Sequence, residues 1–143
     1  MRHLLFIAVM GSGLGLAGCG PAVVVEAEGD SKPPLSIGND PVDIKSASLS
    51  GDILELSLSY SGGCERHSFW LEWDGIFLTS SPVQVPIVVG HDARGDRCEA
   101  LPSETRRFDL TPFKEAWRQG HQQTEGSMSI RIQGTPHSVL YTF

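Results

Sequence analysis

Two cysteines and two histidines are spaced so that they could share one site. Cys64 and His67 form a C-x2-H pair, and His91 and Cys98 form an H-x6-C pair. If the cysteines were reduced, two thiolates and two imidazoles would give the tetrahedral ligand set that Zn²⁺ prefers. The spacing is unusual for a structural zinc site. A disulfide between Cys64 and Cys98 is therefore the competing expectation, and in an exported protein it is the favoured one.

The segment between the cysteines predicts a β-hairpin that would bring these four side chains together. Apolar residues alternate with others along both arms, which is typical of strands with one buried face. Folding about a centre near residue 78 places Leu71 opposite Val85. His67 and His91 then fall on one face at the open end of the hairpin. A register slip of one residue would reverse every face, so this convergence depends on the pairing.

Three interpretations of the histidines follow. Both could join the cysteines in a four-ligand site, or they could bind a divalent metal with Asp92 or Asp96 while the disulfide stays closed. In the third, both histidines lie at the rim of the domain, bonded to backbone carbonyls, and no cofactor is present. The Asp92–Asp96 stretch is also weakly similar to a calcium loop. It lacks the expected bidentate glutamate, which favours a tight turn with Gly95 in a left-handed conformation.

The rest of the mature chain carries no enzyme signature. It has no G-x-S-x-G, H-E-x-x-H or C-x-x-C motif and no glycine-rich phosphate loop, so we expect a protein that is not an enzyme and has no catalytic residues. Trp70 breaks the alternation of its arm. It is expected to project outward and to contact a partner protein or a glycan, unless a second layer or the preceding tether covers it.

The first residues are typical of an export signal. Arg2 precedes an apolar stretch at 4–16, which is too short and too rich in glycine for a spanning helix. The following Leu-Ala-Gly-Cys at 16–19 resembles the lipobox of bacterial lipoproteins. The resemblance implies a signal peptide at 1–18, cleavage before Cys19, a diacylglyceryl thioether on its sulfur and an acyl chain such as palmitate on its amine. The alternative is an ordinary secreted protein with a chance cysteine.

Cleavage there would leave 125 of the 143 residues and, with the loss of Arg2, change the formal net charge from −6 to −7. That length suits one domain, and that charge argues against nucleic acid as a partner. Proline, glycine and acids dominate residues 19–41, which we expect to be a flexible tether with a reach of roughly 25 Å. Part of this segment could instead pair with a sheet edge.

From residue 42 to 143 short alternating segments predict about seven strands. A bulge is expected near Lys45, and Pro86 suggests that its strand lies at a sheet edge or carries a bulge. One short helix should begin after Thr111 as N-cap and end at Gly120. This pattern indicates an all-β fold, a two-layer antiparallel β-sandwich with one short helix, for which an immunoglobulin-like arrangement is one option.

Together these features predict a monomeric lipoprotein of the bacterial cell envelope that acts as a non-catalytic binding or structural module. Its partners would be the membrane, through lipidated Cys19, and an unknown envelope protein or glycan. Gly20 after the cysteine resembles the outer-membrane default of Gram-negative lipoproteins, which implies the periplasmic face of that membrane or the cell surface. The alternative function is metal binding through His67 and His91.

Overall fold

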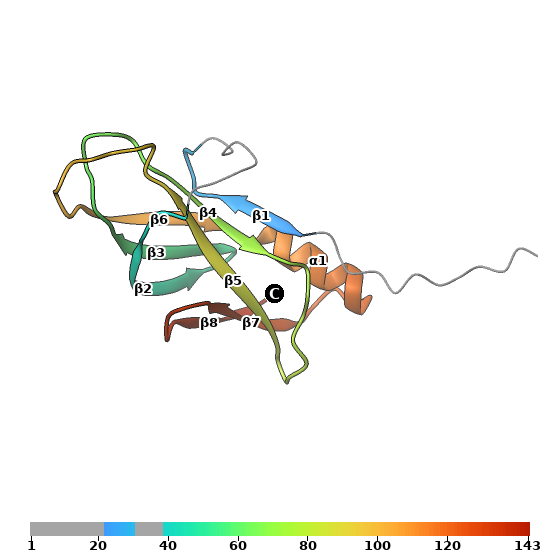
Figure 1. Cartoon of the computed structure of the whole chain (residues 1–143). Coiled ribbons are helices and arrows are strands. Elements are labelled where there is room, and N and C mark those ends of the chain that lie inside the picture. The colour runs from blue at the N-terminus through green and yellow to red at the C-terminus, as the bar shows by residue number, and fades with distance from the viewer. Residues whose placement is uncertain (1–21, 31–38) are drawn as a thin grey trace, which may run out of the picture.

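The computed structural model describes residues 22–30 and 39–143 (Figure 1). The expected signal peptide and the lipid site at Cys19 lie outside these residues. The described part contains eight strands and one helix: β1 (Val23–Glu26), β2 (Asp43–Ser50), β3 (Ile53–Ser59), β4 (Ser68–Trp73), β5 (Val83–Asp92), β6 (Ser103–Asp109), α1 (Thr111–His121), β7 (Ser127–Ile132) and β8 (Ser138–Thr142).

The strands form two sheets, which confirms the predicted all-β, sandwich-like fold with one short helix. One sheet has the order β1-β4-β5-β7-β8 and the other has the order β2-β3-β6. Pairing is antiparallel, as predicted, in every strand pair except β5 and β7, which run parallel. The strand order also differs from the immunoglobulin arrangement of two antiparallel sheets.

The core lies between the sheets and follows the predicted alternation. Inward-facing side chains come from nearly every strand, and the bulge expected near Lys45 is present, because the register shifts between Ile44 and Ser46. The fully buried side chains with the largest volumes are Tyr141, Phe69, Phe108, Phe113, Leu54, Leu56, Leu58, Leu71, Ile87, Leu110, Met128 and Ile130. Such period-two burial explains why the sequence pattern locates these strands well.

The expected hairpin is formed by β4 and β5, but in another register. Leu71 lies opposite Val89 rather than Val85. The two strands are joined by residues 74–82, a connection longer than a tight turn, and Leu78 within it forms a bridge to Gln84 at the start of β5. The shift is an even number of residues, so every side chain keeps its expected face. The pairing therefore still brings His67 and His91 together.

The strand that contains Pro86 is not an edge strand, which corrects that expectation. β5 lies in the middle of its sheet, but β4 pairs with its second half and β7 with its first half. Pro86 falls in the first half, beyond the last β4 pair at Val88. A residue with one paired side can lack a backbone N–H without leaving a partner unsatisfied.

The segment expected to be a tether belongs to the domain wherever the structure describes it. β1 pairs with β4, and Val25 and Ala27 are 7% and 2% exposed in the core. Further along, the N–H of Asp40 donates to the carbonyl of His91 at 3.0 Å. Three valines are too few to make a strand alone, but the free edge of β4 satisfies their backbone groups. The alternative of edge pairing is thus the one that the fold realises.

Helix α1 closes one end of the core with Phe113 and Trp117. It begins at Thr111 and ends at His121, so Thr111 is its first residue and not its N-cap. Leu110 occupies the N-cap position, and the carboxylate of Asp109 accepts the N–H of Thr111 at 2.8 Å. Among the described residues, no helix is long and apolar enough to span a bilayer.

Candidate functional site

The two loops at the open end of the β4–β5 hairpin are joined by the cysteines. Cys64 and Cys98 lie at disulfide distance, with Cα atoms 5.9 Å apart, as the sequence predicts. Gly62 and Gly63 precede the first cysteine, and Gly62 bridges to Ala100 next to the second loop. The bond therefore fastens two loops that are already paired through their backbone.

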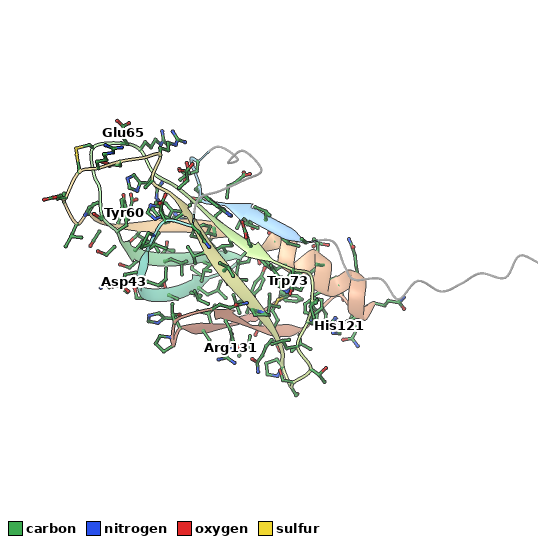
Figure 2. The ribbon with its side chains drawn as sticks, in the orientation of Figure 1. Asp43, Tyr60, Glu65, Trp73, His121 and Arg131 are labelled. Carbon is green, nitrogen blue, oxygen red and sulfur yellow. A yellow bond between two sulfur atoms is a disulfide. The ribbon has the colours of Figure 1, made fainter. Side chains whose placement is uncertain are left out.

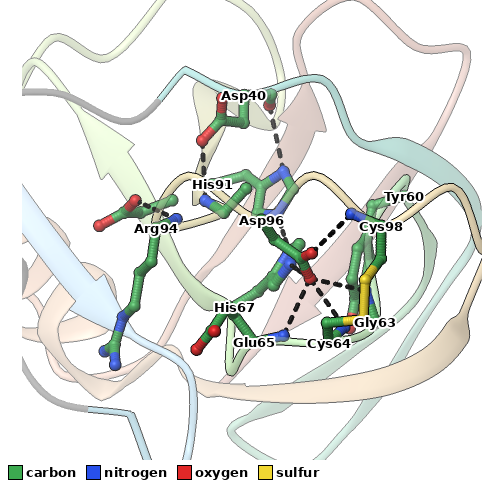
Figure 3. Close-up of polar contacts among 12 residues, drawn as sticks. Asp40, Tyr60, Gly63, Cys64, Glu65, His67, His91, Arg94, Asp96 and Cys98 are labelled. Carbon is green, nitrogen blue, oxygen red and sulfur yellow. Dashed lines mark hydrogen bonds and ion pairs between the residues drawn. A yellow bond between two sulfur atoms is a disulfide. The ribbon is translucent and has the colours of Figure 1, made fainter.

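Asp96 fills the centre of these loops (Figure 3). One carboxylate oxygen accepts the backbone N–H groups of Gly63, Cys64 and Glu65 at 2.8, 2.9 and 2.9 Å, and the other accepts that of Cys98 at 2.9 Å. These hydrogen bonds, led by that from Glu65, hold the pKa of Asp96 well below its usual range. The side chain is 1% exposed, so Asp96 is an internal anion in a nest of amides.

His67 and His91 meet beside this anion. Phe69 pairs with His91 across the hairpin, which makes His67 the diagonal neighbour of His91 on the same face. His67 Nδ1 lies 2.7 Å from His91 Nε2, and His67 Nε2 lies 3.1 Å from the Asp96 carboxylate. Both histidines are almost fully buried. The three side chains form a continuous hydrogen-bonded line, which Figure 3 shows from Asp40 to Asp96.

The hydrogen-bond pattern fixes how many protons this line holds. The Asp96 carboxylate and the carbonyl oxygens of Asp40 and Pro41 only accept, so His67 Nε2 and His91 Nδ1 each carry a proton. The 2.7 Å contact between the rings is made through a proton on one of its two nitrogens. Burial is the largest cause that lowers the pKa of His91, which favours the neutral form of this imidazole.

Aromatic rings enclose the histidine pair. Phe69 stacks on His91 with ring centroids 4.6 Å apart, and Tyr60 lies 4.5 Å from His67. The Tyr60 hydroxyl donates to Glu104 at 2.7 Å. Burial, followed by this hydrogen bond, raises the pKa of Tyr60 to about 12, so the phenol stays neutral. The neutral phenol ring therefore packs on the imidazole of His67 without adding a charge to the buried cluster.

This geometry differs from the predicted metal sites. His67 uses both ring nitrogens in hydrogen bonds, and the cysteine sulfurs are bonded to each other. Sulfur and carboxylate atoms of Cys64, Cys98 and Asp96 do lie within 4.8 Å of one another. A disulfide offers no thiolate ligand, however. In the oxidised protein the cluster is therefore a closed network of protein partners.

Asp92 and Asp96, the two loop carboxylates predicted as partners of the histidines, make different contacts. Asp96 reaches the histidines, whereas Asp92 turns back on its own loop and accepts the N–H of Arg94 at 2.8 Å. Gly95 has φ +74°, so the predicted left-handed turn is present, and Arg94 shares that conformation with φ 53°. The loop therefore turns through two left-handed residues and is held by the hydrogen bond to the Asp92 side chain.

Trp70 does not form the exposed contact that its phase predicted. It lies on the outer face of the sheet, opposite Gly90, but is only 5% exposed. A Cβ atom added to Gly90 would lie 2.1 Å from the indole, so the ring rests on the glycine backbone. Its N–H donates to Glu72. The neighbouring Val88, at 36% exposed, is the accessible apolar residue here.

The structural roles of Asp40 and Tyr60 could not be predicted from the sequence. Asp40 falls in the expected tether, yet its carbonyl meets His91 and its carboxylate accepts the N–H of Ala93 at 2.7 Å. Tyr60 packs on the His67 ring and donates to Glu104, contacts that no local pattern in the sequence indicates. The glycine pair before Cys64 was the available signal for a backbone nest, since such glycines permit close approach of an anion.

Comparisons of the chain with protein-family models, with curated proteins and with solved structures find no match.

Proposed function

We propose that this protein is a lipid-anchored component of the bacterial envelope whose β-sandwich serves as a non-catalytic binding or structural module. The observation that supports the second part is the closed Asp96–His67–His91 network. Its members are buried, and each ring nitrogen has a protein partner. A general acid or base must reach a substrate, which a group in this environment does not do without rearrangement. We therefore assign the network to stability.

The anchor part of the proposal rests on the lipobox-like residues 16–19. Two or more acyl chains hold a protein at a membrane stably, whereas a single chain does so only marginally. An acidic β-domain attached in this way suits contact with an envelope protein or a glycan more than contact with nucleic acid. The proposed location is the periplasmic face of the outer membrane or the cell surface.

Metal binding through His67 and His91 is the competing function. It would require the 2.7 Å contact between the rings to open, because a metal must replace the shared proton. We therefore expect the melting temperature of the purified protein to be the same with and without a chelator. A clear drop in melting temperature on chelation, reversed by one equivalent of Zn²⁺, would replace the structural assignment by the metal site.

Fractionation of cells that express the full chain tests the anchor. We expect the protein to incorporate labelled palmitate and to sediment with membranes, and a Cys19→Ala variant to lose the label. We expect this variant to unfold at the same melting temperature as the wild-type protein measured in detergent. A wild-type protein that is unlabelled and soluble would contradict the proposal.

A further inference from the structure

The path from the proposed lipid site to the folded domain is very short. Residue 22 is the first that the structure describes, and β1 starts at Val23. Three residue steps separate Cys19 from Ala22, which at full extension span at most about 11 Å. The headgroup layer of one leaflet is itself roughly 5–8 Å thick. An anchored domain therefore cannot stand well clear of the bilayer, as a tether of about twenty residues would allow.

The strand pairing identifies the end of the domain that must be nearest the bilayer. Val23, at the start of β1, lies opposite Trp73, the last residue of β4. Residues 74–82 leave β4 at this same end, and Val88 pairs with Glu72 next to it. In Figure 2, Trp73 lies toward this end and Glu65, beside the disulfide, lies at the opposite end. The disulfide loops are thus far from the anchor.

Most of the large apolar side chains that are exposed to solvent lie at this end of the domain. Val24, Ile76, Leu78 and Val88 are 49, 47, 44 and 36% exposed, and of the described residues only two further large apolar side chains are this exposed. Two grooves connect three of them, since Pro86 lines both the groove at Val24 and Val88 and the groove at Leu78. Ile76 lines neither groove, but it belongs to the same 74–82 connection as Leu78. We name Val24, Ile76, Leu78, Pro86 and Val88 the apolar end surface.

The charges around the apolar end surface indicate which membrane component it fits. The groove at Val24 and Val88 is lined by the acids Glu72 and Asp74, and the adjoining groove contains Arg131. The residues that line the two grooves therefore form no basic cluster that would select anionic headgroups. Exposed aliphatic side chains among charges of both signs suit the boundary between headgroups and acyl chains, where the binding free energy scales with the buried apolar area.

We infer that the apolar end surface rests on the bilayer that holds Cys19. The inference depends on the proposed lipidation, which brings this end within reach of the headgroups. It leaves the β2–β3–β6 sheet and the disulfide loops facing away from the membrane. The partner is a lipid surface, and a second copy of this chain or another protein on the same residues would be a different outcome.

Depth-dependent quenching tests the inference. Lipidated protein is reconstituted into phosphatidylcholine vesicles that contain a doxyl-labelled phosphatidylcholine. A fluorophore is attached to a single added cysteine, either Val88→Cys on the apolar end surface or Leu101→Cys as the matched control. Leu101 is also an exposed apolar residue, at 76%, but it lies next to the disulfide loops. We expect several-fold stronger quenching of the label at 88 than of the label at 101.

Two readouts separate the possible failures. Flotation with the vesicles reports the anchor, so protein that stays at the bottom of the gradient refutes the proposed lipidation. Protein that floats but shows equal quenching at both positions overturns the docking surface alone. Self-quenching of the label at 88 that increases with the ratio of protein to lipid would assign the surface to a second copy, and this too overturns the inference. Unchanged melting temperatures establish that both variants are folded.

Discussion

Gly62 is predicted to be the least replaceable residue of the disulfide loops. It has φ +136°, a conformation that side chains rarely adopt, and a Cβ atom there would lie 2.7 Å from the His67 ring and 2.8 Å from the Asp96 carboxylate. Gly62→Ala should therefore cost about 1–3 kcal/mol for the backbone and about 1–3 kcal/mol more for overpacking. The second part arises because neither His67 nor Asp96 can move without breaking the buried network.

Gly63→Ala is the matched control for this prediction. Gly63 is adjacent, has φ +105°, and a Cβ atom there would meet only ordinary contacts, the nearest being Ala100 at 3.6 Å. Urea unfolding followed by tryptophan fluorescence measures both variants, with an unchanged m-value as the condition for comparing them. We expect Gly62→Ala to be less stable than Gly63→Ala by about 1–3 kcal/mol. Equal stabilities would refute the idea that the close approach of His67 and Asp96 excludes a side chain at Gly62.

Three further predictions concern the same end of the molecule and the sheet behind it. Folding lowers the pKa values of both His91 and Asp96, so the unfolded chain binds protons more readily than the folded one. The free energy of unfolding, measured by urea titration, should therefore be highest at neutral pH, decrease as the pH falls below about 6.5, and decrease further below about 3.8. Replacing Cys64 and Cys98 by serine should reduce the free energy of unfolding by about 4 kcal/mol, because the disulfide closes a loop with a sequence separation of 34. An unchanged melting temperature in calorimetry would contradict this prediction. Gly90→Ala should cost about 1–3 kcal/mol, since its Cβ atom would overlap the indole that rests on it; wild-type stability would show that the ring is free to move.

The strands could be predicted from the sequence because burial repeats every second residue. Leu54, Leu56 and Leu58 are fully buried and alternate with half-buried neighbours, which gives a clear period. The same rule placed His67 and His91 on one face even though the register of the hairpin was displaced. A displacement by an even number of residues leaves faces unchanged, so the convergence did not require the correct turn.

Other features depend on contacts that no local pattern contains. β1 is stabilised by the edge of β4, and the parallel pairing of β5 with β7 joins segments separated by the helix. Trp70 has the phase of an exposed residue, but the glycine opposite it lets the ring lie flat and become buried. The role of Asp96 required knowing that two loops meet, because its donors come from residues 63–65 and from Cys98.

The intact mass of the protein extracted from membranes tests both the proposed lipid anchor and the disulfide. We expect a chain that begins at Cys19, carries a diacylglyceryl group and an acyl chain, and is two hydrogens lighter than the reduced form because Cys64 and Cys98 are joined. A chain that begins at another residue, or an unmodified Cys19, would contradict the proposed lipoprotein, and with it the inferred placement of the domain on the bilayer.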